Sequence, residues 1–224
     1  RGLGDVYKRQ DPVTVQASLR AMVDAGCAAA SMEASSHALD QMRVYGVRFV
    51  AAGFTNLSQD HFDYHKGFED YYLCKRRLFE QMGEDNPGAP AVINIDDPYG
   101  ARLYKDCLSL NVKPISYSVA GDADITATQI ELGADETQFL FSAFGNASVA
   151  KTGLVGRFNI SNILCAAGMA LATGIPFEKV AQAISAARPR WGRLEKISSP
   201  TGAQIFVDYA HSPDAIEKVL TTLR

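Results

Sequence analysis

Short apolar runs alternate with helical patterns through the first half of the chain. Such runs, bounded by polar or turn residues, are typical of buried strands, whereas apolar side chains at three- and four-residue spacing are typical of helices. The predicted strands are residues 28–32, 49–55, 90–95 and 113–118. The predicted helices are residues 12–25, 36–42, 68–82 and 99–110, and either Asp11 or Thr14 is the expected N-cap of the first. This alternation indicates βαβ units, so we predict an α/β fold with a mostly parallel sheet flanked by helices.

The pattern changes in the second half of the chain. Three segments alternate apolar and polar residues between turn residues, at 124–132, 137–144 and 147–154. They carry no helical spacing, and they predict antiparallel strands that form a small β subsheet beside the main sheet. Two helices, one strand and a last helix are then predicted at residues 159–173, 177–187, 204–207 and 213–223.

The two ends of the chain have unusual patterns. Residues 1–10 are polar, carry no periodicity and lack an initiating Met, so we interpret them as an artefact leader outside the fold. The last helical pattern runs to Arg224 without a stop signal, which indicates truncation. We place a domain boundary near residues 194–198. The predicted units are one domain over residues 11–194 and the start of a second α/β domain over residues 195–224.

Composition argues against several functional classes. The chain has 224 residues, of which 47% are apolar and 21% charged, and its net charge is −3, which is ordinary for a globular protein. The lack of a basic excess argues against nucleic-acid binding. No apolar run approaches the roughly 20 residues of a membrane helix, so we expect no membrane insertion. The four cysteines are widely spaced, which argues against a zinc site and favours reduced thiols in the cytoplasm.

Polar clusters follow two of the predicted strands. The segment from Glu33 to His37 follows the first, and residues 60–65 (Asp-His-Phe-Asp-Tyr-His) follow the second. Ligands in open α/β sheets bind at such strand ends. The second cluster gathers four potentially ligating side chains in six residues, which favours a metal or phosphate role. Residues of these types also form caps and turns, and Ser35 and Ser36 are equally suited to cap a short helix.

Seven sequence strings, taken in order, resemble those of the Mur ligase family, and the resemblance extends from Asp11 to Arg224. Within the family, they are most similar to the ligases that add the third residue of the peptidoglycan stem peptide. One string alone would be a weak signal, whereas seven in the same order are a strong one. The strings are Met32–Leu39, Phe54–Ser58, Asp60–His65, Cys74–Phe79, Gly156–Asn162, Gly192–Glu195 and Asp208–Ala215.

The resemblance implies the fold of the Mur ligase central domain and the activity of an ATP-dependent amide ligase. Such an enzyme adds an amino acid to UDP-N-acetylmuramoyl-L-alanyl-D-glutamate through an acyl phosphate, in peptidoglycan synthesis. Phosphorylation by ATP gives the carboxylate a leaving group, while Mg2+ and cationic side chains offset the repulsion between the two anions. The implied ligands are ATP, Mg2+, the UDP-N-acetylmuramoyl-dipeptide and an amino acid, and the expected protein is a cytoplasmic monomer.

The resemblance also implies the catalytic and metal-binding residues. Glu33, His61 and Lys75 match the family's magnesium ligands, with Lys75 acting as a carbamate. A histidine ligand is unusual for Mg2+, which prefers oxygen, so the role of His61 comes from the resemblance alone. Carbamylation requires a neutral amine, and the positive charges of Arg76 and Arg77 would lower the pKa of Lys75. Without the resemblance, Lys75 is typical of an exposed helix lysine.

Two further groups of residues match substrate-binding positions of the family. The nucleotide-sugar contacts would be Ser35, Gln41 and Arg43, whose side chains suit a polyanionic ligand. The ATP contacts would be Asn159, Asn162, Arg193 and Asp208, and His211 would belong to the same hinge region. The alternatives are that Gln41 and Arg43 form an exposed helix end and that the asparagines cap a helix.

One expected motif does not occur in the sequence. A Gly-x-x-Gly-Lys-Thr phosphate loop is absent and would be expected upstream of Asp11, so we predict that this chain alone is inactive. Three alternatives remain open. They are another Mur or folylpolyglutamate-type ligase, a non-catalytic nucleotide-binding module, and a metal-dependent hydrolase, which would need a tighter set of ligands. The sequence does not indicate which amino acid is added.

Overall fold

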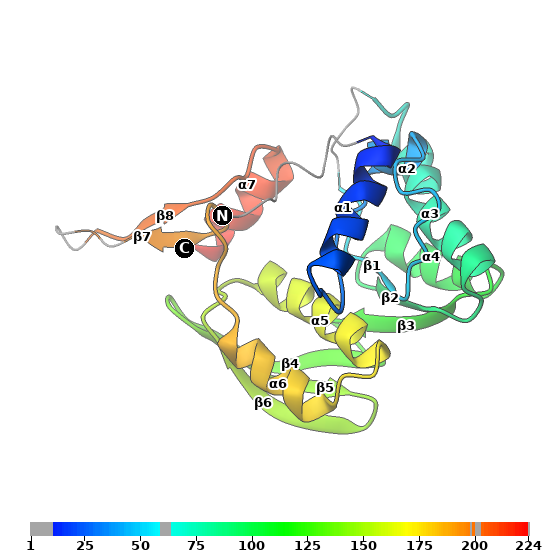
Figure 1. Cartoon of the computed structure of the whole chain (residues 1–224). Coiled ribbons are helices and arrows are strands. Elements are labelled where there is room, and N and C mark those ends of the chain that lie inside the picture. Colours follow the sequence, from blue (N-terminus) through cyan, green and yellow to red (C-terminus); the bar gives the residue numbers. More distant parts are fainter. Residues whose placement is uncertain (1–10, 59–63, 198, 200–202, 224) are drawn as a thin grey trace.

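The structure, a computed structural model, describes residues 11–58, 64–197, 199 and 203–223. Its centre is a six-stranded sheet in which the strands follow one another in chain order (Figure 1). The first four strands pair in parallel, and the last three pair antiparallel. The strands are β1 (Ala52–Phe54), β2 (Pro90–Asn94), β3 (Lys113–Ser118), β4 (Ile125–Leu132), β5 (Thr137–Ala143) and β6 (Asn146–Thr152). The predicted α/β class is confirmed, and the antiparallel strands continue the main sheet through the pairing of β4 with β3.

Helices cover both faces of this sheet. Those that pack on the sheet are α3 (Phe68–Asp85) and α4 (Pro98–Cys107) on one face and α5 (Arg157–Ala172) and α6 (Phe177–Ala186) on the other. The described chain also contains α1 (Pro12–Asp24), α2 (Ser36–Asp40), which packs on α3, and α7 (Pro213–Thr222). Successive residues of a strand point to opposite faces, and β2 shows the result. Val92 belongs to the core shared with α5 and α6, whereas Ala91 and Ile93 belong to the core under α3 and α4. The sheet is therefore buried on both sides, as expected of parallel strands.

Two glycines allow helices to approach the sheet closely. A Cβ atom on Gly168 of α5 would lie 2.7 Å from side-chain atoms of Val92 and Ile125. A Cβ atom on Gly100 of α4 would lie 1.8 Å from the backbone oxygen of Asn94 at the end of β2. Larger residues at either position would push the helix away from the strands. Glycine thus permits the close approach of α4 and α5 to the strands.

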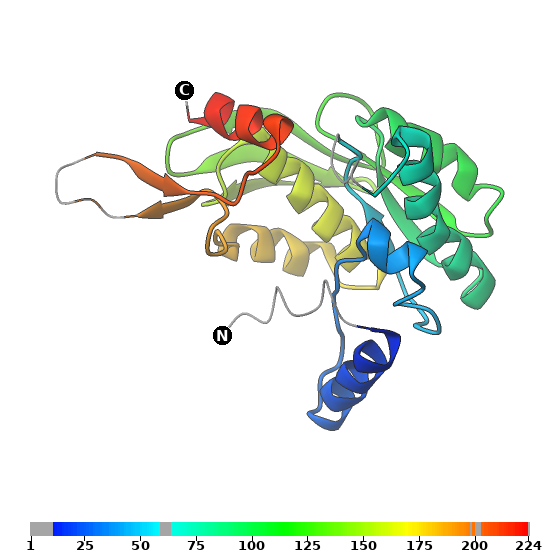
Figure 2. The same ribbon diagram turned by 90° about the horizontal axis from the view of Figure 1, so that it is seen from above.

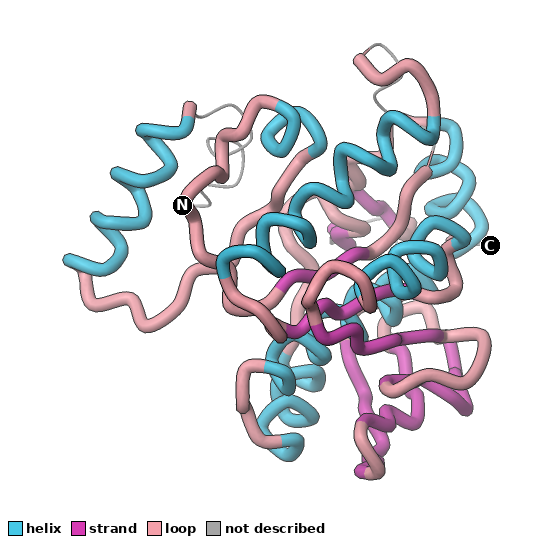
Figure 3. Tube along the Cα trace, turned by 90° about the vertical axis from the view of Figure 1, so that its right-hand side faces the viewer, coloured by secondary structure: helices cyan, strands magenta, loops and turns pink. Residues whose placement is uncertain are grey.

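The prediction of a buried strand at residues 28–32 is wrong. This segment pairs with no strand of the described part of the chain, and Ala28 to Ser31 are exposed. Three alanines and a serine bury little apolar area and have low strand propensity, so the run provides little drive to join the sheet. Helix α1 precedes it at the periphery of the molecule (Figures 2 and 3), and only Val15 of its predicted apolar face is buried. Asp11 is the N-cap of α1, the first of the two predicted alternatives.

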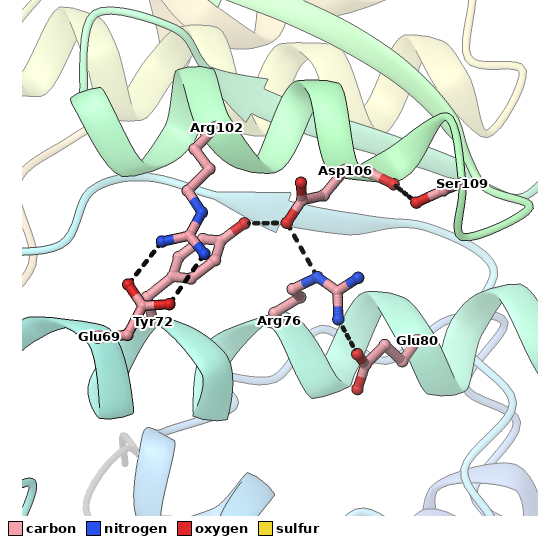
Figure 4. A network of polar contacts seen from close by, with 7 residues as sticks. All are labelled: Glu69, Tyr72, Arg76, Glu80, Arg102, Asp106 and Ser109. Atoms are coloured by element: carbon pink, nitrogen blue, oxygen red, sulfur yellow. Dashed lines mark hydrogen bonds and ion pairs between the residues drawn. The ribbon is translucent and has the colours of Figure 1, made fainter.

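A polar network joins α3 to α4 (Figure 4). One carboxylate oxygen of Asp106 accepts hydrogen bonds from the hydroxyl of Tyr72, at 2.6 Å, and from Nε of Arg76, at 3.0 Å. Arg102 binds both carboxylate oxygens of Glu69 and lies over the Tyr72 ring, 4.2 Å from its centroid. Burial, followed by the hydrogen bond to Asp106, raises the pKa of Tyr72, so this hydroxyl stays a donor. The network fixes the spacing of the two helices over the sheet.

A second, two-stranded sheet lies near the C-terminal end of the described chain. It consists of β7 (Glu195–Ile197) and β8 (Ile205–Val207), which pair antiparallel, and α7 follows it. Strands β7 and β8 and helix α7 are called the C-terminal unit below. The sequence predicted β8 and α7 but not β7, because three residues with a single apolar side chain carry no readable alternation. No helix in the described ranges is both long and apolar enough to cross a membrane.

We expect the substitution Asp106→Ala to lower the free energy of unfolding by about 1–3 kcal/mol, because it leaves the buried Tyr72 hydroxyl without its acceptor. Urea unfolding measures this loss. The loss should shrink in a Tyr72→Phe background, where no hydroxyl needs an acceptor. Asp122→Ala, at an exposed loop position, is the control and should change stability by less than about 0.5 kcal/mol. Equal losses at Asp106 and Asp122 would contradict the role of the network.

Candidate active site

A cleft of about 1130 Å³ lies between the ends of the central strands, the first turns of α5 and the C-terminal unit. All four residues predicted to bind ATP line it, and His211 lines it as well. The four are Asn159, Asn162, Arg193 and Asp208. They come from three separate segments of the chain, and the fold brings them together. A cleft at the carboxyl ends of parallel strands is the usual ligand position in open α/β sheets.

The α5 side of the cleft is built differently from the prediction. The helix begins at Arg157 after Gly156, whose φ of 92° belongs to the left-handed region that favours glycine. The alternative in which an asparagine caps this helix is therefore wrong, because Gly156 holds the cap position. Asn159 lies in the first helical turn, and its side-chain amide donates to the backbone oxygen of Val155 at 2.8 Å. Asn162 lies three residues further along the same helix face and is exposed to the cleft.

The opposite side of the cleft is held by Asp208. One of its carboxylate oxygens accepts from the backbone N–H of Leu194 and the other from that of Ala210, both at 2.7 Å. Leu194 has a φ of 47° and is only 2% exposed, so its strained backbone is held in place by packing and by this bond. The guanidinium of Arg193 lies over the ring of Tyr209, 5.6 Å from the ring centroid. Asp208 thus has a clear structural role in addition to its place in the cleft.

Three polar residues of the cleft were not predicted from the sequence. Asn94 is the last residue of β2, Asp96 and Asp97 follow it, and all three line the cleft floor. Asp97 caps α4 and accepts from the backbone N–H of Leu57, and Asp96 accepts from the backbone N–H of Val119. These bonds tie together the loops that leave neighbouring strands. A signal was present in the sequence, since Asn94 lies near the end of the predicted strand at residues 90–95 and the two aspartates follow that strand directly.

Lys75 contacts the segment that contains Glu33, in a second polar region. The Lys75 ammonium donates to the backbone oxygen of Ala34 at 3.2 Å and lies 5.8 Å from the centroid of the Tyr71 ring. Lys75 is half-buried, and the adjacent Glu33 is exposed. The structure therefore brings the middle of α3 to the Glu33 segment, although the two are about forty residues apart in the sequence. His61 lies outside the described residues, and within those residues no three His, Cys, Asp or Glu side chains are grouped as a metal site.

The three predicted nucleotide-sugar contacts surround the short helix α2. Ser35 is its N-cap and accepts from the backbone N–H of Ala38 at 3.2 Å, which confirms the capping interpretation. At the other end, Nε of Arg43 donates to the side-chain oxygen of Gln41 at 2.9 Å, and Gln41 is exposed. Gln41 and Arg43 thus form a paired amide and guanidinium at the surface.

Charge pairing anchors α2 to its neighbours. The carboxylate of Asp40 accepts from the hydroxyl of Tyr64 at 2.5 Å and from the guanidinium of Arg77 at 2.7 Å. The Tyr64 hydrogen bond, with a further contribution from Arg77, lowers the pKa of Asp40, and the same bond raises the pKa of Tyr64. Asp40 therefore stays ionised at neutral pH and joins α2, α3 and the chain before α3.

Known ligases resemble this chain in sequence and in structure. The ligase named UDP-N-acetylmuramoyl-L-alanyl-D-glutamate–2,6-diaminopimelate ligase from Mesorhizobium japonicum is 41% identical over 215 residues, which are 96% of this chain and 44% of that protein. The enzyme of the same name from Neisseria meningitidis serogroup B is 42% identical over 217 residues, with 95% and 43% covered. A solved structure of a ligase with this name superposes with a TM-score of 0.81 at 30% identity, covering 96% of this chain and 43% of that one.

These relatives are longer than the chain, which spans less than half of their length. The profile of the family described as the Mur ligase middle domain matches residues 5–170. This match extends over well more than half of the 224 residues. The chain therefore belongs to the Mur ligase family, through its middle domain.

Proposed function

We propose that this chain is the nucleotide-binding and metal-binding part of an ATP-dependent ligase. The ligase would add 2,6-diaminopimelate to UDP-N-acetylmuramoyl-L-alanyl-D-glutamate. The observation that carries the proposal is the convergence of Asn159, Asn162, Arg193 and Asp208 in one cleft at the strand ends. The choice of amino acid rests on the names of the two relatives above. The cytoplasm is the proposed location, since all four cysteines are free thiols, which fits a reducing compartment.

The proposed reaction has two steps, phosphorylation of the substrate carboxylate and then formation of the amide bond. The substrate carboxylate attacks the γ-phosphate of ATP, and ADP leaves with the electron pair of the broken bond, which gives an acyl phosphate. The amine of the incoming amino acid then attacks the acyl carbon, phosphate leaves, and the amine proton passes to a base. Asn162, exposed on α5, and Arg193 would contact ATP in the cleft. Gln41 and Arg43 would bind the anionic nucleotide-sugar by charge-assisted hydrogen bonds.

The residues near Lys75 fit a magnesium ion. Mg2+ is commonly held by one or two carboxylates, and Glu33 would supply one, since it directly precedes Ala34, whose backbone oxygen accepts from the Lys75 amine. Carbamylation of Lys75 would supply a second carboxylate while the nitrogen keeps one N–H, so the bond to the Ala34 oxygen is compatible with it. His61 would complete the set. When bound, Mg2+ would offset the negative charge that accumulates on the phosphoryl oxygens.

The full gene product tests the reaction. Incubated with UDP-N-acetylmuramoyl-L-alanyl-D-glutamate, ATP and Mg2+, it should release phosphate and form the tripeptide product with 2,6-diaminopimelate. Lysine lacks one carboxylate and should react at least about tenfold more slowly, because a site built for that group is left unpaired. Phosphate release measures the reaction rate with each amino acid, and the product mass shows which amino acid was added. Absence of phosphate release with every amino acid offered would favour the non-catalytic nucleotide-binding alternative.

Lys75→Arg should lower kcat by about 100- to 1000-fold, because arginine keeps the positive charge but cannot become a carbamate. The KM for ATP should change little. Lys105→Arg, on the exposed side of α4, is the matched control and should keep the parent rate. A short carboxylic acid added to Lys75→Ala should restore part of the rate by taking the place of the carbamate. A Lys75→Arg variant with the parent kcat would remove the carbamate from the proposal.

Asn162→Ala should weaken ADP binding by about tenfold, the effect of one lost hydrogen bond. Because Asn162 is exposed, the substitution should leave the thermal unfolding temperature unchanged. Asn146→Ala, at an exposed position outside the cleft, is the control of the same residue type. Calorimetric titration with ADP measures both variants. Equal affinities for the two variants would contradict the placement of ATP beside α5.

A further inference from the structure

Tyr71 is the closest aromatic neighbour of Lys75 on its own helix. The two residues are four positions apart on α3, so their side chains lie on the same face. Tyr71 is 7% exposed, and its ring centroid lies 5.8 Å from the Lys75 nitrogen. A cation at this distance from a ring face is attracted by the quadrupole of the ring. The ring and the Ala34 oxygen together give the long lysine side chain a defined direction.

His65 packs on Tyr71 and limits its movement. The two rings stack with their centroids 4.8 Å apart and an interplanar angle of 13°. Nδ1 of His65 lies 3.4 Å from a carboxylate oxygen of Asp70, one residue before Tyr71. Nε2 of His65 has no hydrogen-bond partner among the described residues, although the residue is only 4% exposed. An unpaired buried nitrogen is costly, whereas the stacked ring packs on Tyr71 and Nδ1 faces Asp70.

The same rings connect the two polar motifs of the sequence. His37, which follows the Glu33 segment, lies against Tyr64 with ring centroids 4.1 Å apart. Tyr64 in turn meets His65 edge-on at 5.0 Å. The four rings of His37, Tyr64, His65 and Tyr71 are called the ring cluster below. It joins the Glu33 segment, the chain before α3 and α3 itself around the Lys75 side chain.

We propose that Tyr71 and His65 are positioning residues for Lys75, with the His65 ring holding the Tyr71 ring and the Tyr71 ring holding the lysine side chain. The role of Lys75 rests on the proposed function. In that role the lone pair of the neutral amine attacks the carbon of carbon dioxide, an N–C bond forms, and one C–O π bond breaks with its electron pair left on oxygen. One N–H proton passes to water. The second N–H stays on the Ala34 oxygen. The Tyr71 ring, held by His65, thus keeps the nitrogen at the backbone of Ala34, the residue after Glu33, before carbon dioxide or metal arrives.

The rate at which the Lys75 amine is chemically modified tests the positioning directly. Reductive methylation of the full gene product in buffer free of carbon dioxide is followed by mass spectrometry of the peptide that contains Lys75. Tyr71→Leu should raise the rate about two- to fivefold, because the amine is released from the ring, whereas Tyr71→Phe should keep the parent rate. Lys113, exposed on β3, is the internal control and should react equally in all variants. Equal Lys75 rates in Tyr71→Leu and Tyr71→Phe would overturn the proposal.

If Tyr71→Leu unfolds, the methylation rate of Lys113 should rise together with that of Lys75. A pair of His65 variants then tests the positioning of Lys75 instead. His65→Phe keeps a ring on Tyr71 and removes the unpaired nitrogen, so it should keep the parent rate at Lys75. His65→Asn keeps a polar group near Asp70 but removes the ring, so it should raise the rate. The same rate in both variants would overturn the stacking role of His65.

The carbamate is measured separately, by the 13C signal that appears after equilibration with labelled bicarbonate. The signal should be present in the parent and in Tyr71→Phe, and reduced in Tyr71→Leu. Altered methylation without any carbamate signal in the parent would support the positioning role and remove the carbamate from the proposed function. An unchanged methylation rate with a full carbamate signal in every variant would overturn the positioning role and leave the proposed function intact.

Discussion

The close approach of α5 to the central sheet is the constraint on which the rest of the structure depends. Gly168 places the helix against Val92 and Ile125, and on the strand side a Cβ atom on Gly53 would lie 2.7 Å from Sγ of Cys165. Cys165 lies in this contact as a neutral thiol, since burial raises its pKa to about 11. A helix packed this closely has little freedom to slide, because every shift meets side chains in dense contact. Its first turn is therefore fixed beside the strand ends.

The position of the cleft follows from this packing and from the parallel order of the first strands. Parallel strands end on one edge of a sheet, and their polar loops must meet there. Asp97 caps α4 and also accepts from the backbone N–H of Leu57, which lies in the loop after the neighbouring strand β1. One carboxylate therefore serves both the helix and the cleft floor. Gly100, which has no Cβ atom, permits the first turn of α4 to pack against the backbone oxygen of Asn94. The cleft therefore has a rigid floor that exists before any ligand binds.

The sequence predicted most elements because the apolar runs are buried on both faces. Strand β3 has the predicted bounds of residues 113–118, and its last four residues are buried. The prediction of a strand at residues 28–32 was wrong, because the alanines of this apolar run bury little area. Short elements such as β7 carry too little pattern. The role of Asp96 depends on Val119, which is distant in the sequence, so no local pattern reveals it.

The predicted site residues divide in a similar way. Ser35 was recognised as a possible cap from its local surroundings, because a cap depends on residues only three positions away. The grouping of Lys75 with the Glu33 segment came from the family resemblance, because it depends on the packing of α3 against a segment about forty residues earlier. Neither the local sequence pattern nor the family resemblance indicated that Tyr71 and His65 support Lys75, since stacking of rings leaves no periodic signal in the sequence. Tertiary geometry was needed to find it.

The C-terminal unit is held to the rest of the molecule by contacts of a different kind. Lys196 pairs with Asp135 across exposed surface, and such pairs contribute little to stability because water and salt screen them. Thr222 of α7 packs on Gly156, where a Cβ atom would lie 2.7 Å from its methyl group. Neither contact buries a large apolar area. A ligand that touches both Asn162 and Asp208 would therefore supply a large share of the free energy that holds the two sides of the cleft together.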